Sequence, residues 1–260
     1  MKTDRVRAKK FFGQHFLKDE HIAQLIVEAL KPPADCKQVL EIGPGMGVLT
    51  RYLITKPEFE TFVSEIDFES IAYLEEHFPS LKKNILKGDF LKMDLASQFK
   101  STVAIIGNFP YNISSQILFQ VLENKNQVPI VVGMFQKEVA VRLTSKPGNR
   151  DYGILSVLLQ AWYDLEYLFT VDADKFIPPP RVQSAVIRLI RKKNTTIGCD
   201  EVEFKKVIKQ AFNQRRKTLR NALRSLVPSD RLNSLPYLDL RAEALSWQQF
   251  VELTLAIHKE

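Results

Sequence analysis

Residues 39–47 read Val-Leu-Glu-Ile-Gly-Pro-Gly-Met-Gly, an apolar strand that runs into a glycine-rich turn. A helical pattern begins directly afterwards, near Leu49. Glycine at alternate positions (Gly43, Gly45 and Gly47) lets the backbone turn tightly and approach a ligand without a Cβ atom in the way. The pattern is GxGxG rather than the GxGxxG of dinucleotide-binding folds, which weakens a pyrophosphate-binding interpretation. Taken alone, a purely structural strand-to-helix turn explains the segment about as well.

Strand-length and helix-length segments alternate from residue 20 onward. The predicted strands are Gln38–Ile42, Thr61–Ile66, Thr102–Ile106 and Ile130–Phe135. The predicted helices are His21–Leu30, Leu49–Ile54, Glu69–Phe78, Ser114–Glu123 and Gln136–Thr144. This alternation predicts an α/β fold whose parallel sheet is covered on both faces. A late strand over Ser184–Ile190 would close the sheet in the antiparallel direction.

The pattern changes after residue 193, beyond which no strand is predicted. Helices are expected over Glu203–Leu226 (one or two), Asp239–Leu245 and Trp247–His258. We therefore predict an α/β domain over residues 1–193, with a basic N-terminal arm over residues 1–18, and a small all-α domain over residues 194–260. The net charge of +7 is concentrated in the arm and the C-terminal domain. Basic ends suggest a polyanionic partner, although ends that only promote solubility explain the charge equally well.

The composition excludes several classes of protein. With 260 residues, 45% of them hydrophobic and 26% charged, the chain has the balance of a globular protein rather than a disordered one. No apolar run reaches the roughly 18 residues that a membrane-spanning helix needs, and no apolar segment of a secretory signal follows the basic N-terminus. Cys36 and Cys199 are the only cysteines, so we expect no disulfide framework, no metal site and a reducing, cytoplasmic location.

Two acidic residues follow strands at the edge of the sheet that carries the glycine turn. Glu65 closes the next strand and can accept hydrogen bonds from both hydroxyls of a ribose. Asp89 stands where the third strand would end and can accept a hydrogen bond from an adenine amino group. Because ligands of such sheets bind at the carboxyl ends of the strands, these features together favour a nucleoside cofactor. Glu41 either contacts the opposite end of that cofactor through water or only anchors the loop.

The fourth predicted strand runs into Asn108-Phe109-Pro110-Tyr111. The side-chain oxygen of Asn108 and the carbonyl oxygen of Pro110 can accept both hydrogens of an exocyclic amine. Two acceptors favour a more tetrahedral nitrogen whose lone pair faces an electrophile, a form of electrostatic preorganisation. Tyr111 offers a face on which a base can stack. The alternative is a simple turn with Tyr111 packed in the core.

Several motifs together resemble one enzyme family. The Asn-x-Pro-Tyr segment and Glu41–Gly45 (EIGPG) resemble the class I S-adenosylmethionine methyltransferases that modify N6 of adenine in ribosomal RNA. Three further segments narrow the resemblance to the KsgA family of small-subunit rRNA adenine dimethyltransferases: Phe12–Leu17 (FGQHFL), Phe176–Val186 (FIPPPRVQSAV) and Phe212–Asn221 (FNQRRKTLRN). The resemblance covers residues 7–226 and implies a Rossmann-like methyltransferase domain followed by a small all-α domain.

The resemblance also assigns roles to residues, with S-adenosylmethionine as the cofactor. The implied cofactor contacts are His15, Leu17, Gly43, Gly45, Glu65, Asp89 and Asn108. The implied catalytic residues are Asn108, Pro110, Tyr111 and Phe176, with Phe176 and Tyr111 stacking on either side of a flipped adenine. Alternatively, Phe176 fills the core, as aromatic side chains more often do. Two positions depart from the family pattern: Phe109 stands where a smaller aliphatic residue is usual, and His15 where asparagine is more common.

The predicted RNA-binding residues are Arg215, Arg216, Lys217, Arg220 and Arg224. On one continuous helix, Arg216, Arg220 and Arg224 would recur at every fourth residue and form a basic ridge. A ridge that contacts only solvent is the usual alternative, but the neighbouring base-binding motifs favour RNA.

The resemblance implies dimethylation of two adjacent adenosines in the 3′-terminal hairpin of 16S rRNA, on the 30S subunit or its precursor, by a monomeric protein. No side chain need act as a strong base, because the sulfonium group of the cofactor is already activated. One alternative is an Erm-type 23S rRNA methyltransferase, which does not usually carry the FNQRRKTLRN segment. Another is a non-catalytic rRNA-binding assembly factor, against which the intact Asn108, Pro110 and Tyr111 argue.

Overall fold

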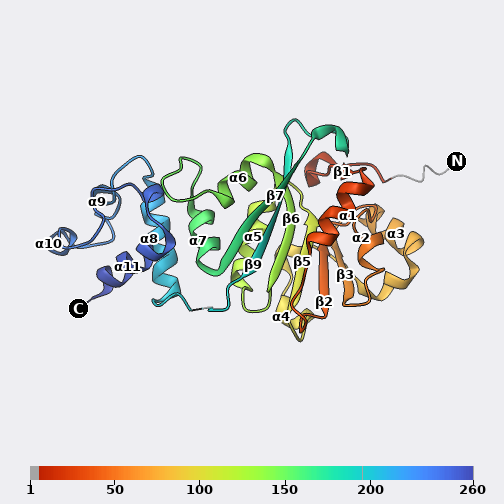
Figure 1. Cartoon of the computed structure of the whole chain (residues 1–260), viewed down its shortest axis with the longest axis horizontal. Coiled ribbons are helices and arrows are strands. Elements are labelled where there is room, and N and C mark those ends of the chain that lie inside the picture. Colours follow the sequence, from red (N-terminus) through yellow and green to blue (C-terminus); the bar gives the residue numbers. More distant parts are fainter. Residues whose placement is uncertain (1–5, 195, 260) are drawn as a thin grey trace. The chain divides into compact units, whose positions relative to one another are not determined.

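The chain forms a seven-stranded β-sheet with the order β4-β3-β2-β5-β6-β9-β7 (Figure 1). The computed structural model describes residues 6–194 and 196–259, so the first five residues of the predicted arm, Thr195 and Glu260 lie outside the described residues. The strands are β2 (Gln38–Ile42), β3 (Glu60–Glu65), β4 (Ile85–Lys87), β5 (Val103–Asn108), β6 (Ile130–Gln136), β7 (Tyr163–Val171) and β9 (Ser184–Arg191). Strands β2 to β6 pair in parallel, and β9 pairs antiparallel with β6. The predicted α/β class and the antiparallel late strand are confirmed.

Helices connect these strands at nearly the predicted positions. They are α1 (Glu20–Ala29), α2 (Thr50–Leu53), α3 (Phe68–His77), α4 (Leu95–Gln98), α5 (Ser114–Glu123) and α6 (Lys137–Thr144). Aspartates at the N-caps explain two of the starting points: Asp19 accepts a hydrogen bond from the amide of Ile22 (3.1 Å), and Asp67 accepts one from the amide of Glu69 (3.1 Å). Within residues 6–194 and 196–259, no helix is long and apolar enough to cross a membrane.

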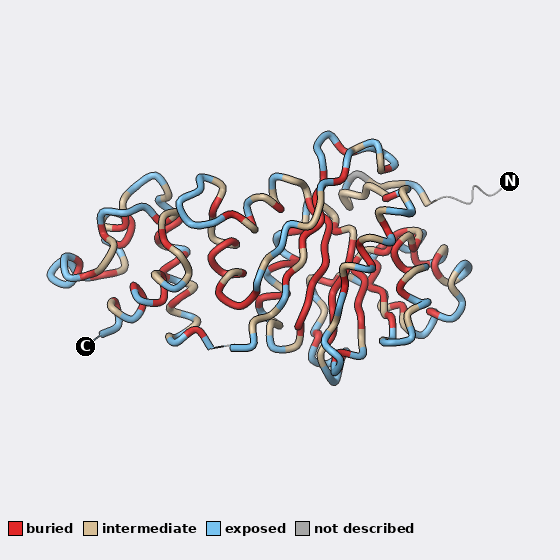
Figure 2. Tube along the Cα trace, in the orientation of Figure 1, coloured by how far each residue is buried: buried red, intermediate tan, exposed pale blue. Residues whose placement is uncertain are grey.

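The sheet is buried on both faces, as the strands drawn in red in Figure 2 show. On one face, Ile26 of α1 packs in a cluster with Val39, Ile106 and Val132 from three neighbouring strands. Leu40, the next residue after Val39, points to the opposite face and is also fully buried. Burial on both faces explains why these strands read as continuous apolar runs, and it leaves only the strand ends free to hold polar groups.

The described chain divides into two compact units. One contains the chain up to Ala140 together with Glu166–Arg191, and the other contains Val141–Leu165 together with the chain from Lys192 onward. The predicted boundary at residue 193 assigns residues 141–165 to the first domain, whereas they group here with the C-terminal helices. The reason is packing: α7 (Ile154–Trp162) contacts α8 (Glu201–Asn213), and the ring of Trp162 meets that of Phe204 edge-on at 5.9 Å.

The sequence pattern did not reveal α7 or β7. Strand β7 lies at the edge of the sheet, and most of its residues are exposed or half-buried. It therefore lacks the apolar run that marked the central strands.

The predicted continuous basic ridge is wrong. Helix α8 ends at Asn213, and the chain turns over residues 214–217 before α9 (Leu219–Ala222) begins. Backbone pairing enforces the turn, because the amide of Leu219 donates to the carbonyl oxygen of Leu240 (2.8 Å). Arg216 consequently lies in the turn rather than on a helix with Arg220. A short helix, α10 (Ser229–Leu232), and a longer one, α11 (Trp247–His258), complete this unit, which also contains a 3-10 turn over Ala242–Ala244 where a longer helix was predicted.

Tyr152 is fully buried, and none of the described residues offers a hydrogen-bond partner to its hydroxyl group. Burial raises the pKa of this phenol above its ordinary value. Because an unpaired buried hydroxyl costs free energy, we expect Tyr152→Phe to leave the free energy of unfolding unchanged or to raise it by up to about 1 kcal/mol.

Ser156→Ala is the matched control for Tyr152→Phe in a urea titration. The hydroxyl of Ser156 donates to the carbonyl oxygen of Arg142 (2.6 Å) and accepts from the amide of Gly153 (3.0 Å). Losing both bonds should lower the free energy of unfolding by about 1–2 kcal/mol. A larger loss of free energy of unfolding for Tyr152→Phe than for Ser156→Ala would contradict this prediction, because it would show that the phenol hydroxyl has a hydrogen-bond partner.

Candidate active site

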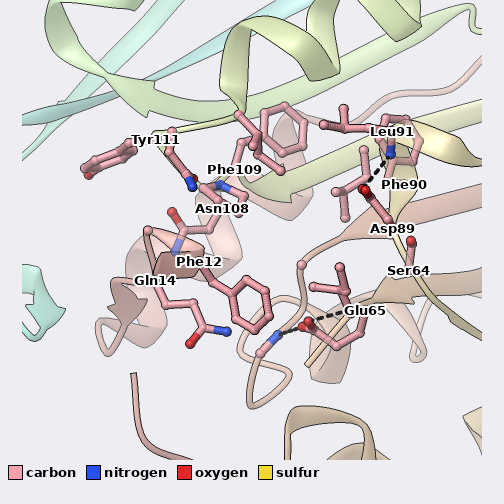
Figure 3. Close-up of a pocket in the computed structure, with 18 of the residues that line it drawn as sticks. Phe12, Gln14, Ser64, Glu65, Asp89, Phe90, Leu91, Asn108, Phe109 and Tyr111 are labelled. Carbon is pink, nitrogen blue, oxygen red and sulfur yellow. Dashed lines mark hydrogen bonds between the residues drawn. The ribbon is translucent and has the colours of Figure 1, made fainter. Parts of the chain in front are cut away.

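A cavity of about 270 Å³ lies at the carboxyl ends of the parallel strands (Figure 3). The lining residues are Phe11–Phe16, Ile42, Gly43, Gly45, Ser64–Ile66, Gly88–Leu91 and Asn108–Ile113. In Figure 3, Asn108 and Tyr111 lie toward one side of the cavity, and Glu65 and Asp89 lie toward the other. Residues from distant parts of the sequence meet here because parallel strands end at the same edge of the sheet.

Glu65 ties the glycine turn to the loop after β3. It is only 4% exposed, and its carboxylate accepts hydrogen bonds from the amides of Gly45 (3.2 Å), Ile66 (2.9 Å) and Asp67 (2.9 Å). Burial raises the pKa of Glu65, whereas the amide hydrogen bonds lower it. The carboxylate borders the cavity, so it is held in place at the position where we expect a ribose.

Glu41 does not line the cavity. It is 1% exposed, and its carboxyl oxygen accepts a hydrogen bond from the hydroxyl of Thr50 (2.5 Å), the first residue of α2. Burial, aided by the nearby charge of Glu65, raises the pKa of Glu41 to about 8. Of the two roles left open for Glu41, the structure therefore shows the loop-anchoring one.

Asp89 borders the cavity on the same side as Glu65 (Figure 3). One of its carboxylate oxygens accepts a hydrogen bond from the amide of Leu91 (3.0 Å), which orients the side chain. Both acidic residues predicted to hold a nucleoside are thus at the cavity. Among residues 6–194 and 196–259, no group of three His, Cys, Asp or Glu side chains is placed to hold a metal ion.

The N-terminal segment, residues 9–17, forms one wall of the cavity and is bound to the rest of the protein at both ends. At its start, Lys9 forms ion pairs with Asp67 and with Glu69 (3.2 Å), and hydrogen bonding to Asp67 raises the pKa of this lysine. At its end, β1 (Phe16–Leu17) pairs antiparallel with β8 (Phe176–Ile177). Lys9 belongs to the predicted basic arm. At least this positive charge of the arm is therefore paired with carboxylates of the protein itself.

Gly45 allows this wall to approach the glycine turn. Its φ angle is +55°, a conformation that residues with a Cβ atom rarely adopt. A Cβ atom here would also come within 2.6 Å of the ring of Phe16. The second glycine of the motif therefore lets the N-terminal segment pack directly on the turn.

Asn108 ends β5 and reaches the N-terminal segment. Its Nδ2 group donates a hydrogen bond to the carbonyl oxygen of His15 (2.8 Å). Because this bond uses the donor end of the amide, Oδ1 is left as an acceptor at the cavity, which Asn108 lines. The orientation matches the predicted role of Asn108 as an acceptor for an amine.

Pro110 and Tyr111 follow in a turn that the protein holds firmly. The carbonyl oxygen of Pro110 accepts from the amide of Ile113 (3.2 Å), which leaves its second lone pair available. The hydroxyl of Tyr111 hydrogen-bonds with the buried hydroxyl of Ser184 on β9. Tyr111 is half-buried and lines the cavity, so it is not the core residue of the alternative interpretation.

Phe176 and Leu17 are placed differently from the other predicted site residues. Both belong to the hydrophobic core, with exposures of 1% and 4%, and neither lines the cavity. The predicted sandwich of Phe176 and Tyr111 is therefore not formed in this structure. The ring that stacks on Tyr111 is that of His15, at 5.3 Å between centroids. Pairing of β1 with β8 draws Phe176 into the core, which is the alternative position that the sequence left open for this residue.

The unusual Phe109 is accommodated by two glycines. Its ring is 1% exposed and packs edge-on against Phe135, with centroids 5.2 Å apart. A Cβ atom at Gly107 would come within 2.7 Å of this ring, and one at Gly133 would meet it as well. The absence of both side chains makes room for an aromatic residue where a smaller one is usual.

The five predicted RNA-binding residues fall into two groups. Arg215 donates to the carboxylate of Glu243 (2.9 Å) and to the carbonyl oxygens of Tyr152 (3.0 Å) and Arg150, so it braces its own unit. Arg220 pairs with Asp239 (3.2 Å) and Asn233 (2.8 Å). The second group comprises Arg216, Lys217 and Arg224, whose side chains are exposed.

Gln14, Phe12 and Phe90 are among the cavity residues to which the sequence analysis assigned no role. Gln14 accepts from the amide of Lys9 (2.9 Å) and lies 3.5 Å from Asp67. Gln14 stands between Gly13 and His15 in the Phe12–Leu17 motif, so the sequence did indicate a position near the site. Phe12 begins the same motif, but aromatic residues are usually core residues, so neither Phe12 nor Phe90 was assigned to the site.

Comparison with known proteins extends over nearly the whole chain. The model of the family described as "Ribosomal RNA adenine dimethylase" matches residues 5–258. A protein of Cytophaga hutchinsonii named "Ribosomal RNA small subunit methyltransferase A" is 58% identical over 251 residues, which cover 96% of this chain and 97% of that protein.

Two solved structures have a similar fold. A dimethyladenosine transferase from Plasmodium falciparum has a TM-score of 0.75 at 25% identity and covers 92% of this chain and 96% of its own. The 23S rRNA methyltransferase ErmE has a TM-score of 0.68, also at 25% identity, and covers 94% of this chain and 100% of its own. The fold is therefore shared by a protein named as a dimethyladenosine transferase and by one named as a 23S rRNA methyltransferase.

The buried carboxyl of Glu41 predicts a pH-dependent stability. In the folded protein the carboxyl of Glu41 stays protonated up to about pH 8. In the unfolded chain the same carboxyl loses its proton near its ordinary pKa of 4.5. Between these values the folded state binds the extra proton, so rising pH lowers the free energy of unfolding. Glu41→Gln imitates the protonated form and escapes this loss.

The difference in free energy of unfolding, Glu41→Gln minus wild type, should therefore increase with pH across this window by up to about 1.4 kcal/mol per pH unit. Above the folded-state pKa of Glu41 this difference should become constant. It is measured by urea titrations of both proteins at a series of pH values. A difference that does not change with pH would mean that Glu41 is ionised in the folded protein.

Proposed function

Because the chain belongs to the ribosomal RNA adenine dimethylase family, we propose that it transfers methyl groups from S-adenosylmethionine to N6 of two adjacent adenosines in the 3′-terminal hairpin of 16S rRNA. Each adenosine receives two methyl groups on the 30S subunit or its precursor. The observation that carries this choice is the identity with a relative named for the small subunit. We also propose that the reaction takes place in the cytoplasm and that the protein acts as a monomer.

The residues around the cavity fit S-adenosylmethionine. The volume of about 270 Å³ is close to the lower end of the range for small-molecule sites, roughly 300–1,000 Å³. Glu65 and Asp89 offer acceptors to the ribose hydroxyls and the adenine amino group, while Gly43 and Gly45 let the backbone approach the methionine part. When bound, the cofactor supplies a methyl group on a positively charged sulfur. His15 and Asn108 border the same cavity.

Asn108 and Pro110 prepare the amine of the target adenine. The lone pair of this amine is delocalised into the ring, which makes the amine a poor nucleophile. Oδ1 of Asn108 and the carbonyl oxygen of Pro110 accept its two hydrogens and favour the tetrahedral form, whose lone pair is free to bond an electrophile. Because the bond to His15 already orients the Asn108 amide, little reorganisation is needed when the adenine enters.

The choice of ribosomal RNA can be tested with labelled cofactor. Unmethylated 30S and 50S particles are incubated in parallel with the protein and methyl-labelled S-adenosylmethionine, and the label is then located. We expect dimethyladenosine in 16S rRNA. Label in 23S rRNA would retain the chemistry and overturn the substrate, as for an Erm-type enzyme. Label in neither, with cofactor binding demonstrated, would support a non-catalytic assembly factor.

Asn108→Ala tests the chemistry at the same site. Removing the acceptor for the amine should lower kcat by about 10²–10³-fold, as the loss of a preorganised hydrogen-bonding group does in other enzymes. The affinity for S-adenosylmethionine, measured by calorimetry without RNA, should fall by no more than a few-fold, since the bond to His15 is lost but the carboxylates and the glycine turn remain. Activity close to that of the wild type would show that Asn108 does not accept the amine hydrogens.

The exposed cations of the second unit are the proposed contacts to phosphate. Replacing Arg216, Lys217 and Arg224 with Gln should weaken RNA binding and reduce the slope of log K against log salt by about 0.7–0.9 for each lost phosphate contact. The matched control is Arg215→Gln, which removes a cation already paired with Glu243. It should lower the thermal stability while changing the slope less. An unchanged slope in the triple variant would identify these residues as a solvated surface.

A further inference from the structure

Strand β3 carries two buried hydroxyl groups that have no hydrogen-bond partner within residues 6–194 and 196–259. They belong to Thr61 and Ser64, which are 5% and 2% exposed. A buried hydroxyl without a partner costs free energy, so a ligand that supplies the partner is bound more tightly. The two residues differ in one respect: Ser64 borders the cavity, and Thr61 does not.

Ser64 stands at the end of the cavity where we expect the nucleoside of the cofactor. It directly precedes Glu65, the proposed acceptor for the ribose hydroxyls. Across the sheet it pairs with Leu86 of β4, the strand that leads into Asp89. Figure 3 shows Ser64 on the same side of the cavity as Glu65 and Asp89. The hydroxyl therefore belongs to the part of the cavity expected to hold the adenine and its ribose.

The backbone of Ser64 is fixed, so only its hydroxyl can adjust to a ligand. Its carbonyl oxygen accepts from the amide of Gly43 (2.9 Å), and the residue pairs with Ile42 on one side and Leu86 on the other. The hydroxyl turns about one side-chain torsion with three staggered positions. Because Ser64 is 2% exposed, bulk water is excluded as its partner, and the cavity that it borders is the remaining source of one.

We propose that Ser64 is a further cofactor-binding residue, whose hydroxyl donates a hydrogen bond to a ring nitrogen of the adenine of S-adenosylmethionine. Between the amino group and the ribose, the only polar ring atoms of adenine are acceptor nitrogens: N1 and N3 on one edge and N7 on the other. A serine hydroxyl can donate to any of them. The inference rests on the proposed function and deepens it by adding a residue that recognises the base itself.

Ser64→Ala and Thr61→Val form a matched pair of variants. Each removes one unpartnered hydroxyl from β3, but only Ser64→Ala alters the lining of the cavity. The Kd of S-adenosylhomocysteine, which carries the same nucleoside, is measured by calorimetry without RNA. It should rise by about 3- to 10-fold in Ser64→Ala, the effect of losing one hydrogen bond, and stay at the wild-type value in Thr61→Val.

The stability of the cofactor-free proteins is the second readout. Neither substitution breaks a hydrogen bond within the described chain, so the urea midpoint of each variant should equal or exceed that of the wild type. A lower midpoint for Ser64→Ala would show that the hydroxyl has a partner within the protein, and the proposal would be wrong.

Analogues of S-adenosylhomocysteine identify the accepting atom. Replacing N1, N3 or N7 of the adenine by a C–H group gives three ligands, each of which lacks one acceptor. The Kd of each is measured with the wild type and with Ser64→Ala. For one analogue the two proteins should bind equally well, because the bond is already lost, whereas the 3- to 10-fold difference should persist for the other two.

Two binding results would overturn the proposal. One is a Kd of S-adenosylhomocysteine in Ser64→Ala equal to that of the wild type. The other is a weakening by Ser64→Ala that is the same for the parent ligand and for all three analogues, because a general change in the shape of the site would affect all four ligands alike.

These measurements use no RNA, so the inference and the choice of ribosomal RNA fail separately. If the wild type methylates 16S rRNA and Ser64→Ala binds all four ligands as the wild type does, the role of Ser64 is refuted and the proposed function stands. If the label enters 23S rRNA, the proposed substrate is wrong, while the binding results for Ser64 keep their meaning. A wild type that does not bind S-adenosylhomocysteine would refute both.

Discussion

The hydrogen bond between Nδ2 of Asn108 and the carbonyl oxygen of His15 joins two segments that lie 93 residues apart. Through it, the turn after β5 and the N-terminal segment become two walls of one cavity. The same bond uses the donor of the Asn108 amide and so presents its oxygen to a substrate amine. The pairing of β1 with β8 and the ion pair between Lys9 and Asp67 hold the segment at its ends, so that the bond forms without further ordering.

Two glutamates near the glycine turn show two ways in which the free-energy cost of burying a carboxylate is reduced. Burial raises the pKa of Glu65, and the hydrogen bonds that it accepts from three backbone amides stabilise its negative charge and offset part of that rise. Glu41 is deeper and has the hydroxyl of Thr50 as its partner, so protonation is the less costly solution. The first carboxyl can bind a polar ligand, whereas the second fastens α2 to the strand before the turn.

The second unit uses some of its arginines for its own structure. Arg215 joins its own turn to two other segments, through the carboxylate of Glu243 and through the neighbouring carbonyl oxygens of Arg150 and Tyr152. A guanidinium group is suited to this because its five donors form a rigid fork. A run of basic residues in the sequence is therefore divided between internal bracing and an exposed surface, and only the partners of each side chain tell the two apart.

The sequence by itself determined the α/β fold, the positions of the central strands and of the helices between them, and the carboxylates and Asn108 at the cavity. These depend on local patterns: apolar runs for strands such as Gln38–Ile42, and polar residues where such strands end. Only the tertiary structure decided the place of Phe176, the partners of Arg215 and the grouping of residues 141–165 with the C-terminal helices. The physical reason is that each depends on contacts with residues distant in the chain, such as Leu17 opposite Phe176 and Glu243 opposite Arg215, and no local pattern encodes them.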